Sequence, residues 1–327
     1  MMNLPIPRSP VLGLSAPGQW ALLLLVAILG AGCEDSRVRA DCSQWNTKEF
    51  FQQAHVSDVR TCLEAGASLE VRNFFGEKPI HVAAMHSNKP AVIGLLVEAG
   101  ADPNALAAEG TTPLHAAVDL NSNLRVIEAL ARTGADPNRQ DHYGWMPLHV
   151  AVVDPHHAAG ITETLLKIGA DPRARGYYGT TALHRAARYA THPKAVIRIL
   201  CKAGVDPNVR TANGSAPLHW AATYSGGSDA IRVLVKAGAD PNVQDHAGAT
   251  ALHRAIRFNE RPKAVVETLI EVGTDPSIRN LAGLTPWEYV QMYDPMENTG
   301  SWQALRDGYL KGLGRASAPE PAWGPPD

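Results

Sequence analysis

The sequence predicts an all-helical solenoid of stacked helix-turn-helix units joined by extended finger hairpins. A histidine recurs every 34 or 35 residues, and a glycine stands five residues before each copy. Self-similarity at such a period is typical of solenoids, whose units bury their apolar faces only against neighbouring units. The recurring histidines are His81, His115, His149, His184, His219 and His253, and the glycines are Gly76, Gly110, Gly144, Gly179, Gly214 and Gly248.

Each unit opens its first helix with a short motif that ends at the recurring histidine. Proline suits the first helical turn, where its missing N–H would have no partner, and a preceding Thr can cap the helix. The motif runs Lys78–His81, Thr112–His115, Met146–His149, Thr181–His184, Ala216–His219 and Thr250–His253. Paired alanines such as Ala83-Ala84 and Ala186-Ala187 follow and allow a second helix to approach closely.

The second helix of each unit carries apolar residues at helical spacing, as in Val196, Ile197, Ile199 and Leu200. Pro90, Pro193 and Pro262 are expected to start second helices. A glycine that can adopt the left-handed conformation ends the helix, and a following Asp-Pro turns the chain into the finger. Copies of this ending are Gly100–Asn104, Gly134–Asn138, Gly204–Asn208 and Gly238–Asn242.

These residues resemble the ankyrin repeat, whose helix-opening motif is Thr-Pro-Leu-His. The resemblance covers about residues 47–313, as about eight units that include a degenerate cap at each end. The stretch from the motif Leu or Ile to the closing glycine is 20 or 21 residues, slightly longer than in the common unit, and the usual Gly-His between the helices is absent. The resemblance implies a scaffold that binds proteins and is not an enzyme.

The residues before the repeats predict export. Arg8 precedes an uncharged stretch that ends in small residues and Cys33, which is the layout of a secretory signal. The small residues directly before Cys33 resemble the lipobox of bacterial lipoproteins, which implies a signal peptide over residues 1–33 and lipidation of Cys33. We also expect a short linker over 34–46 and a disordered tail over 314–327. Cleavage after Ala40 and an uncleaved membrane anchor remain alternatives. Each places the repeats on the periplasmic side of a bacterial cell envelope, lipid-anchored or released.

The remaining cysteines fit that compartment. In an oxidising environment Cys42 and Cys62, which flank the first helix, are expected to pair, and the bond would contribute roughly 3 kcal/mol by closing a loop. Cys201 occupies a Leu position in its unit and is expected to be a buried apolar residue.

Charge and motifs exclude several classes of function. The net charge is -2, with 30 basic and 32 acidic residues, so the basic footprint of a nucleic-acid-binding protein is missing. The motif histidines lie one per unit, about 8–10 Å apart along a helix stack, and are expected to bond backbone and Thr hydroxyls between units rather than share a metal. No catalytic motif occurs. We expect no cofactor, contact with the membrane only through the N-terminal lipid or anchor, and a monomer.

The finger tips predict where a protein partner binds, because aromatic residues are enriched in interface hot spots. Two functions follow: an envelope adaptor that recognises one protein through these tips, or a spacer or stress-protective component without a specific ligand. The expected partner-binding residues are Phe74, Phe75, His142, Tyr143, Trp145, Tyr177 and Tyr178.

Overall fold

The computed structural model describes residues 41–121, 123–224, 227–259 and 262–293. These residues belong to the unit Ala40–Asp327. The predicted signal peptide with Cys33, the first part of the linker and the predicted tail over 314–327 lie outside the described residues.

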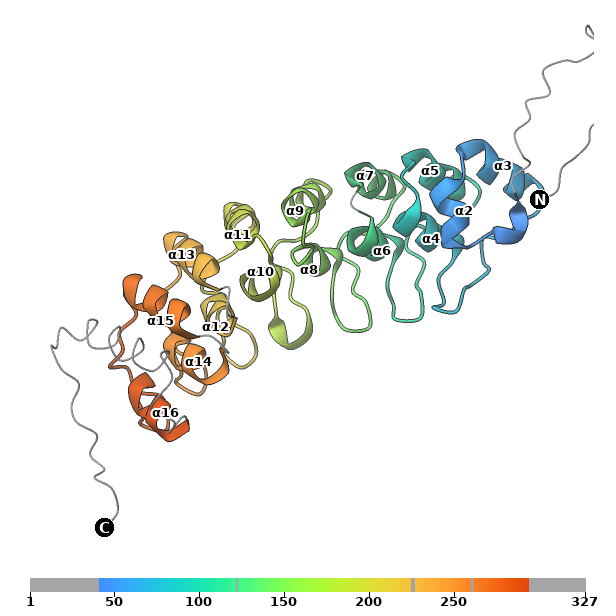
Figure 1. Cartoon of the computed structure of the whole chain (residues 1–327). Coiled ribbons are helices and arrows are strands. Elements are labelled where there is room, and N and C mark those ends of the chain that lie inside the picture. The colour runs from blue at the N-terminus through green and yellow to red at the C-terminus, as the bar shows by residue number, and fades with distance from the viewer. Residues whose placement is uncertain (1–40, 122, 225–226, 260–261, 294–327) are drawn as a thin grey trace, which may run out of the picture. The chain divides into compact units, whose positions relative to one another are not determined.

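The described chain folds into helices in consecutive pairs, followed by the helix α16 (Figure 1). The pairs are α2 (Lys48–Gln53) with α3 (Val56–Glu64), α4 (Pro79–His86) with α5 (Pro90–Glu98), α6 (Pro113–Leu120) with α7 (Leu124–Arg132), α8 (Pro147–Ala151) with α9 (Ala158–Lys167), α10 (Ala182–Tyr189) with α11 (Pro193–Lys202), α12 (Pro217–Ala222) with α13 (Ser228–Lys236), and α14 (Ala251–Phe258) with α15 (Pro262–Glu271); α16 (Pro286–Tyr293) follows.

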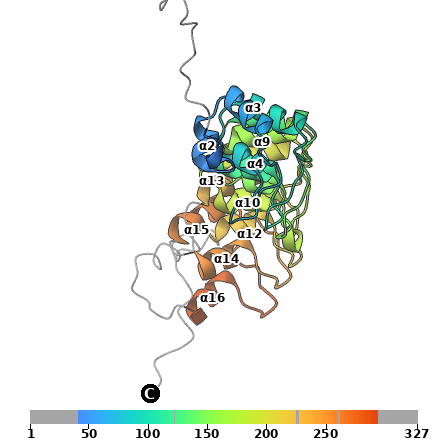
Figure 2. The same ribbon diagram turned by 90° about the vertical axis from the view of Figure 1, so that its right-hand side faces the viewer.

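The helices stack in two rows. The even-numbered helices from α2 to α16 form one row and the odd-numbered helices from α3 to α15 form the other, and within each row every helix contacts the corresponding helix of the next repeat. Long finger loops project from the same side of successive repeats (Figure 2). No strand occurs in the part of the chain that the structure describes. The predicted all-helical solenoid is confirmed, including the second helices that begin at Pro90, Pro193 and Pro262.

Local sequence sets the ends of each helix. At the start of α6, the Thr112 hydroxyl accepts the His115 N–H at 3.4 Å, and Pro113 occupies the first turn. At the end of α5, Gly100 has a φ of 106°, and the following Ala101 N–H donates to Leu96 O at 2.9 Å. Since that conformation suits glycine alone among common residues, the closing glycine fixes where each second helix ends.

The core is a thin layer of small aliphatic side chains between the rows. In the central repeat Leu183, Ile197 and Leu200 are fully buried. Ala186 and Ala187 are buried as well and leave room for the neighbouring helices. Each layer is thus completed by the next repeat, which explains why the chain can be long without one large core.

The asparagine that ends each closing motif joins one repeat to the next. Asn104 donates from Nδ2 to Gly134 O at 2.9 Å, and its Oδ1 accepts the Asp136 N–H at 2.7 Å. Asn138 and Asn208 repeat both bonds one and three units later. At position 173 an arginine replaces the asparagine and donates from Nε to Gly204 O at 3.0 Å. The side chain that ends each closing motif therefore also holds adjacent repeats together through hydrogen bonds.

The folded unit begins earlier than the predicted boundary at Thr47. A 3₁₀ turn, η1 (Cys42–Gln44), precedes α2, and Trp45 donates from Nε1 to Ser68 O at 2.9 Å. The Trp45 ring lies 5.4 Å from the Phe50 ring, measured between centroids. Residues predicted as the last part of a 34–46 linker thus cover the exposed end of the core. A Cys42–Cys62 disulfide, with the Cα atoms 5.4 Å apart, joins this turn to α3.

Candidate functional site

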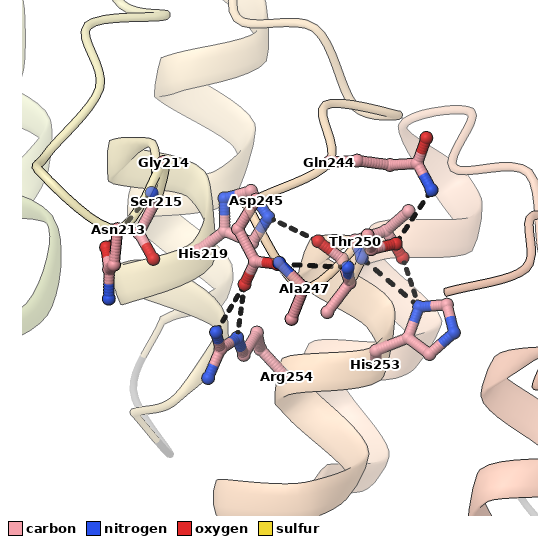
Figure 3. Close-up of polar contacts among 12 residues, drawn as sticks. Asn213, Gly214, Ser215, His219, Gln244, Asp245, Ala247, Thr250, His253 and Arg254 are labelled. Carbon is pink, nitrogen blue, oxygen red and sulfur yellow. Dashed lines mark hydrogen bonds and ion pairs between the residues drawn. The ribbon is translucent and has the colours of Figure 1, made fainter. Parts of the chain in front are cut away.

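The motif histidines form a structural network that crosses six successive repeat boundaries, beginning with the one after α4 and α5. In each unit Nδ1 accepts the backbone N–H at the start of the helix, as His253 does from Thr250 at 3.2 Å (Figure 3). Nε2 contacts a carbonyl oxygen in the next finger. The Nε2 contacts are His81 with Ala105 at 3.0 Å, His115 with Trp145 at 3.0 Å, His149 with Thr180 at 3.2 Å, His184 with Ser215 at 3.0 Å, His219 with Ala249 at 2.9 Å, and His253 with Leu284 at 3.0 Å.

These contacts require neutral histidines. A backbone N–H can only donate, so Nδ1 is unprotonated, and Nε2 carries the proton that it donates to the carbonyl. Burial lowers the pKa of His81, His149 and His184 to about 4, against the opposing effect of those hydrogen bonds. Thr hydroxyls, expected to bond between units, instead contact the histidine of their own unit, as Thr112 Oγ1 does at 2.9 Å from His115 Nδ1.

Figure 3 also shows an ion pair between the finger residue Asp245 and Arg254 on the following helix, α14. Asp245 Oδ1 accepts the N–H groups of Ala247 at 2.8 Å and Ala249 at 3.0 Å. Its Oδ2 accepts from Arg254 Nε at 2.8 Å and forms an ion pair with the same guanidinium. A finger carboxylate thus neutralises the arginine that follows the motif histidine.

Most of the predicted aromatic tips are exposed. The exposed fractions are 94% for Phe74, 66% for Phe75, 53% for Tyr143, 52% for Tyr177 and 76% for Tyr178. Phe74 and Phe75 lie edge to face, with ring centroids 5.4 Å apart, and cover little of one another.

The structure brings three of the predicted residues together in a groove lined by three successive fingers and by α12. Trp145, Tyr177 and Tyr178 line it, and its volume is about 480 Å³. We call it the tyrosine groove. Its other lining residues are Thr180, Thr211, Ala212, Asn213 and Trp220. Phe74, Phe75, His142 and Tyr143 are not among its lining residues, so the predicted surface divides into a groove and separate tips.

The finger that carries the two tyrosines has an unusual backbone. Residues Tyr177–Gly179 form a 3₁₀ turn, η2, in which Tyr178 has a φ of 53°. A non-glycine residue in that left-handed region costs roughly 1–2 kcal/mol and is common at functional sites. Gly176 occupies the place where other fingers have residues such as Asp141 or Asp245, whose carboxylates hold the turn.

Comparison with known proteins identifies the repeat. The family described as ankyrin repeats (3 copies) matches residues 52–141, 120–211 and 190–280, which together span well over half of the chain. The chain belongs to the ankyrin-repeat family. A crystal structure of the human ASB11 ankyrin repeat domain matches with a TM-score of 0.59 and 23% identity, covering 71% of this chain and 98% of that one. No curated protein matches.

Ankyrin repeats generally mediate protein–protein interaction. Ankyrin-repeat proteins are typically non-enzymatic binding scaffolds. Within the described ranges, no group of three or more His, Cys, Asp or Glu side chains is placed to hold a metal ion. None of the helices described is both long and apolar enough to cross a membrane.

Two residues at the tyrosine groove were not predicted from the sequence, one that lines it and one that packs on a lining residue. Trp220 lines the groove from α12, and Arg185 on α10 stacks on Trp145, with Cζ 4.5 Å from the ring centroid. Burial lowers the pKa of the Arg185 guanidinium, but an arginine stays charged in proteins. Both residues directly follow a motif histidine. That position varies between units, from Val82 and Ala116 to Arg185, Trp220 and Arg254, and this variation is the signal that the sequence offers.

Proposed function

We propose that this ankyrin-repeat protein is a non-catalytic adaptor that binds another protein through the tyrosine groove and the separate aromatic tips. The observation behind the proposal is the set of exposed aromatic rings at the finger tips. The hydrogen bonds that fix the backbone of these fingers do not involve the rings. Exposed aromatic side chains beside an apolar concavity are costly to leave in water and are common in hot spots. As a part of this proposal, the adaptor works as a monomer.

The proposed location is the periplasmic side of a bacterial cell envelope, with Cys33 lipidated. The signal-like residues 1–33 support this part of the proposal, as does the Cys42–Cys62 pair, because disulfides persist in oxidising compartments. Binding at the groove and anchoring at Cys33 would let the adaptor hold a partner near a membrane.

Crosslinking in intact cells followed by mass spectrometry tests the adaptor. Wild type is expected to capture a specific protein that the combined Phe74→Ala, Phe75→Ala, Tyr177→Ala and Tyr178→Ala variant loses. The matched control is Leu281→Ala, since Leu281 is 80% exposed at another finger tip outside the groove. Equal capture by wild type and the combined variant, or no specific capture by either, would reject the adaptor in favour of a spacer.

A single substitution separates binding from stability. Tyr178→Gly removes one ring and relieves the left-handed backbone, so the free energy of unfolding should stay the same or rise by up to about 1 kcal/mol. Crosslinking to the partner should fall at least several-fold. Urea unfolding followed by circular dichroism checks the first expectation. A Tyr178→Gly protein that is less stable and still binds would contradict both.

A further inference from the structure

Arg185 is the charged residue beside the tyrosine groove. Its side chain is half-buried against Trp145, and its Nε is buried without a hydrogen-bond partner among the described residues. Its guanidinium makes no ion pair with any described residue. The nearby Asp141 uses Oδ1 to accept the N–H groups of Tyr143 at 2.9 Å and Trp145 at 2.7 Å in its own finger, and it forms no hydrogen bond or ion pair with Arg185. Unpaired buried donors are costly, so an acceptor from elsewhere would stabilise this site.

The equivalent arginine of a later repeat shows which acceptor fits. Arg254 follows its motif histidine as Arg185 does, and it pairs with Asp245, eight residues before that histidine. In the repeat of Arg185 the same position is Gly176. A Cβ atom at Gly176 would lie 2.9 Å from Gly144 O and 2.9 Å from Trp145 Cε3. The finger therefore supplies no carboxylate here.

The surroundings favour a peptide over a nucleic acid. The adjacent finger arginines are already engaged with backbone: Arg175 Nη1 donates to Arg210 O at 2.8 Å, and Arg210 Nη1 donates to Gln244 O at 2.7 Å. No continuous track of available cations runs along the described fingers for a phosphate backbone to follow. A single guanidinium beside rings and small side chains instead matches one carboxylate next to one apolar side chain.

Resting on the proposed function, we infer that the tyrosine groove binds an extended acidic segment of the partner. An apolar or aromatic side chain of that segment lies between Tyr178 and Trp220, and a carboxylate one or two residues away binds the Arg185 guanidinium. The partner thus provides the carboxylate that Asp245 provides to Arg254. The carboxylate belongs either to an Asp or Glu side chain or to the end of the partner chain.

Random peptide libraries displayed with blocked or free C-termini test this on the full-length protein. Selected peptides should be enriched in Asp or Glu beside an apolar residue, or require a free C-terminus, which distinguishes the two sources. Replacing the selected acid by its amide in synthetic peptides should weaken binding to wild type roughly 10-fold, because a charge-assisted bond is lost. Arg185→Gln should bind acid and amide equally.

Arg198→Gln is the charge-matched control, since Arg198 is exposed on α11 away from the groove lining, and it should keep the preference for acid. Trp220→Ala, with its fold checked by circular dichroism, should lose both peptides. Selection through the groove without an acidic preference would overturn the inference and leave the adaptor standing. The inference also fails if no peptide is selected, or if oligothymidylate binds more tightly than peptides and loses that binding in Arg185→Gln. The crosslinking experiment in intact cells tests the adaptor function separately from this inference.

Discussion

Lowering the pH from 7.5 to 5 is expected to destabilise the repeat stack by about 6 kcal/mol. The motif histidines are neutral in the fold, and three of them have pKa values of about 4, below the ordinary 6.5. Unfolded histidines take up protons first as the pH falls. Stability is therefore fully present above about pH 6.5 and is lost progressively down to about pH 4.

The physical cause lies in Nδ1. Protonation would turn the acceptor of a backbone N–H into a second donor, and it would bury a charge between two repeats. Burial also lowers the pKa of His115, His219 and His253, which adds to the loss. Since most domains are stable by only about 5–15 kcal/mol, a loss of this size should unfold much of the stack. Urea unfolding at successive pH values, followed by circular dichroism, measures it.

His184→Gln separates this effect from general acid sensitivity. A glutamine three residues after the helix start can still accept the backbone N–H through its amide oxygen but does not titrate. The variant should be less stable at pH 7.5 and lose less between pH 7.5 and 5, by about 2 kcal/mol. His156→Gln, at an exposed turn outside the network, is the matched control. A wild-type stability that is flat over this range would contradict the network's role.

The repeats could be predicted because every unit begins and ends its helices with the same kinds of residue. The motif histidine, the first-turn proline and the closing glycine answer backbone requirements that recur at a fixed period, so the sequence reveals both the fold and the register of its units. The tyrosine groove could be predicted only in part. Tyr177 and Tyr178 stand out as tip aromatics, but Trp220 and Arg185 join them through packing between repeats.

The capping turn at the start of the fold left no periodic signal. Cys42–Asn46 belongs to no repeat, and its contacts are made to residues much further along the chain, such as Trp45 to Ser68. Asn46, in a left-handed conformation with a φ of 66°, donates to Val71 O at 3.3 Å and Glu77 O at 3.1 Å. The spacing of the two cysteines was the one sequence feature that predicted a link between this turn and α3. A disulfide stabilises a solenoid end, which lacks a neighbouring repeat.

Loss of the Cys42–Cys62 bond is expected to destabilise the first repeats by about 3 kcal/mol. The bond closes a loop with a sequence separation of 20 residues and therefore restricts the unfolded chain. Cys42→Ser is the variant of choice, because Cys42 is only partly buried whereas Cys62 is fully buried. Hydrogen exchange should show faster opening of α2 and α3, with α11 to α15 unchanged.

Cys201→Ser is the matched control, since it removes a half-buried free thiol far along the stack. It should leave exchange in α2 and α3 as in wild type. The same cysteines test the proposed compartment. Alkylation of intact cells, with mass spectrometry of the isolated chain, should leave Cys42 and Cys62 unlabelled until a reductant is added. Because the disulfide would persist only in an oxidising compartment, labelling of both cysteines without reductant would reject export while leaving the fold and the groove untouched.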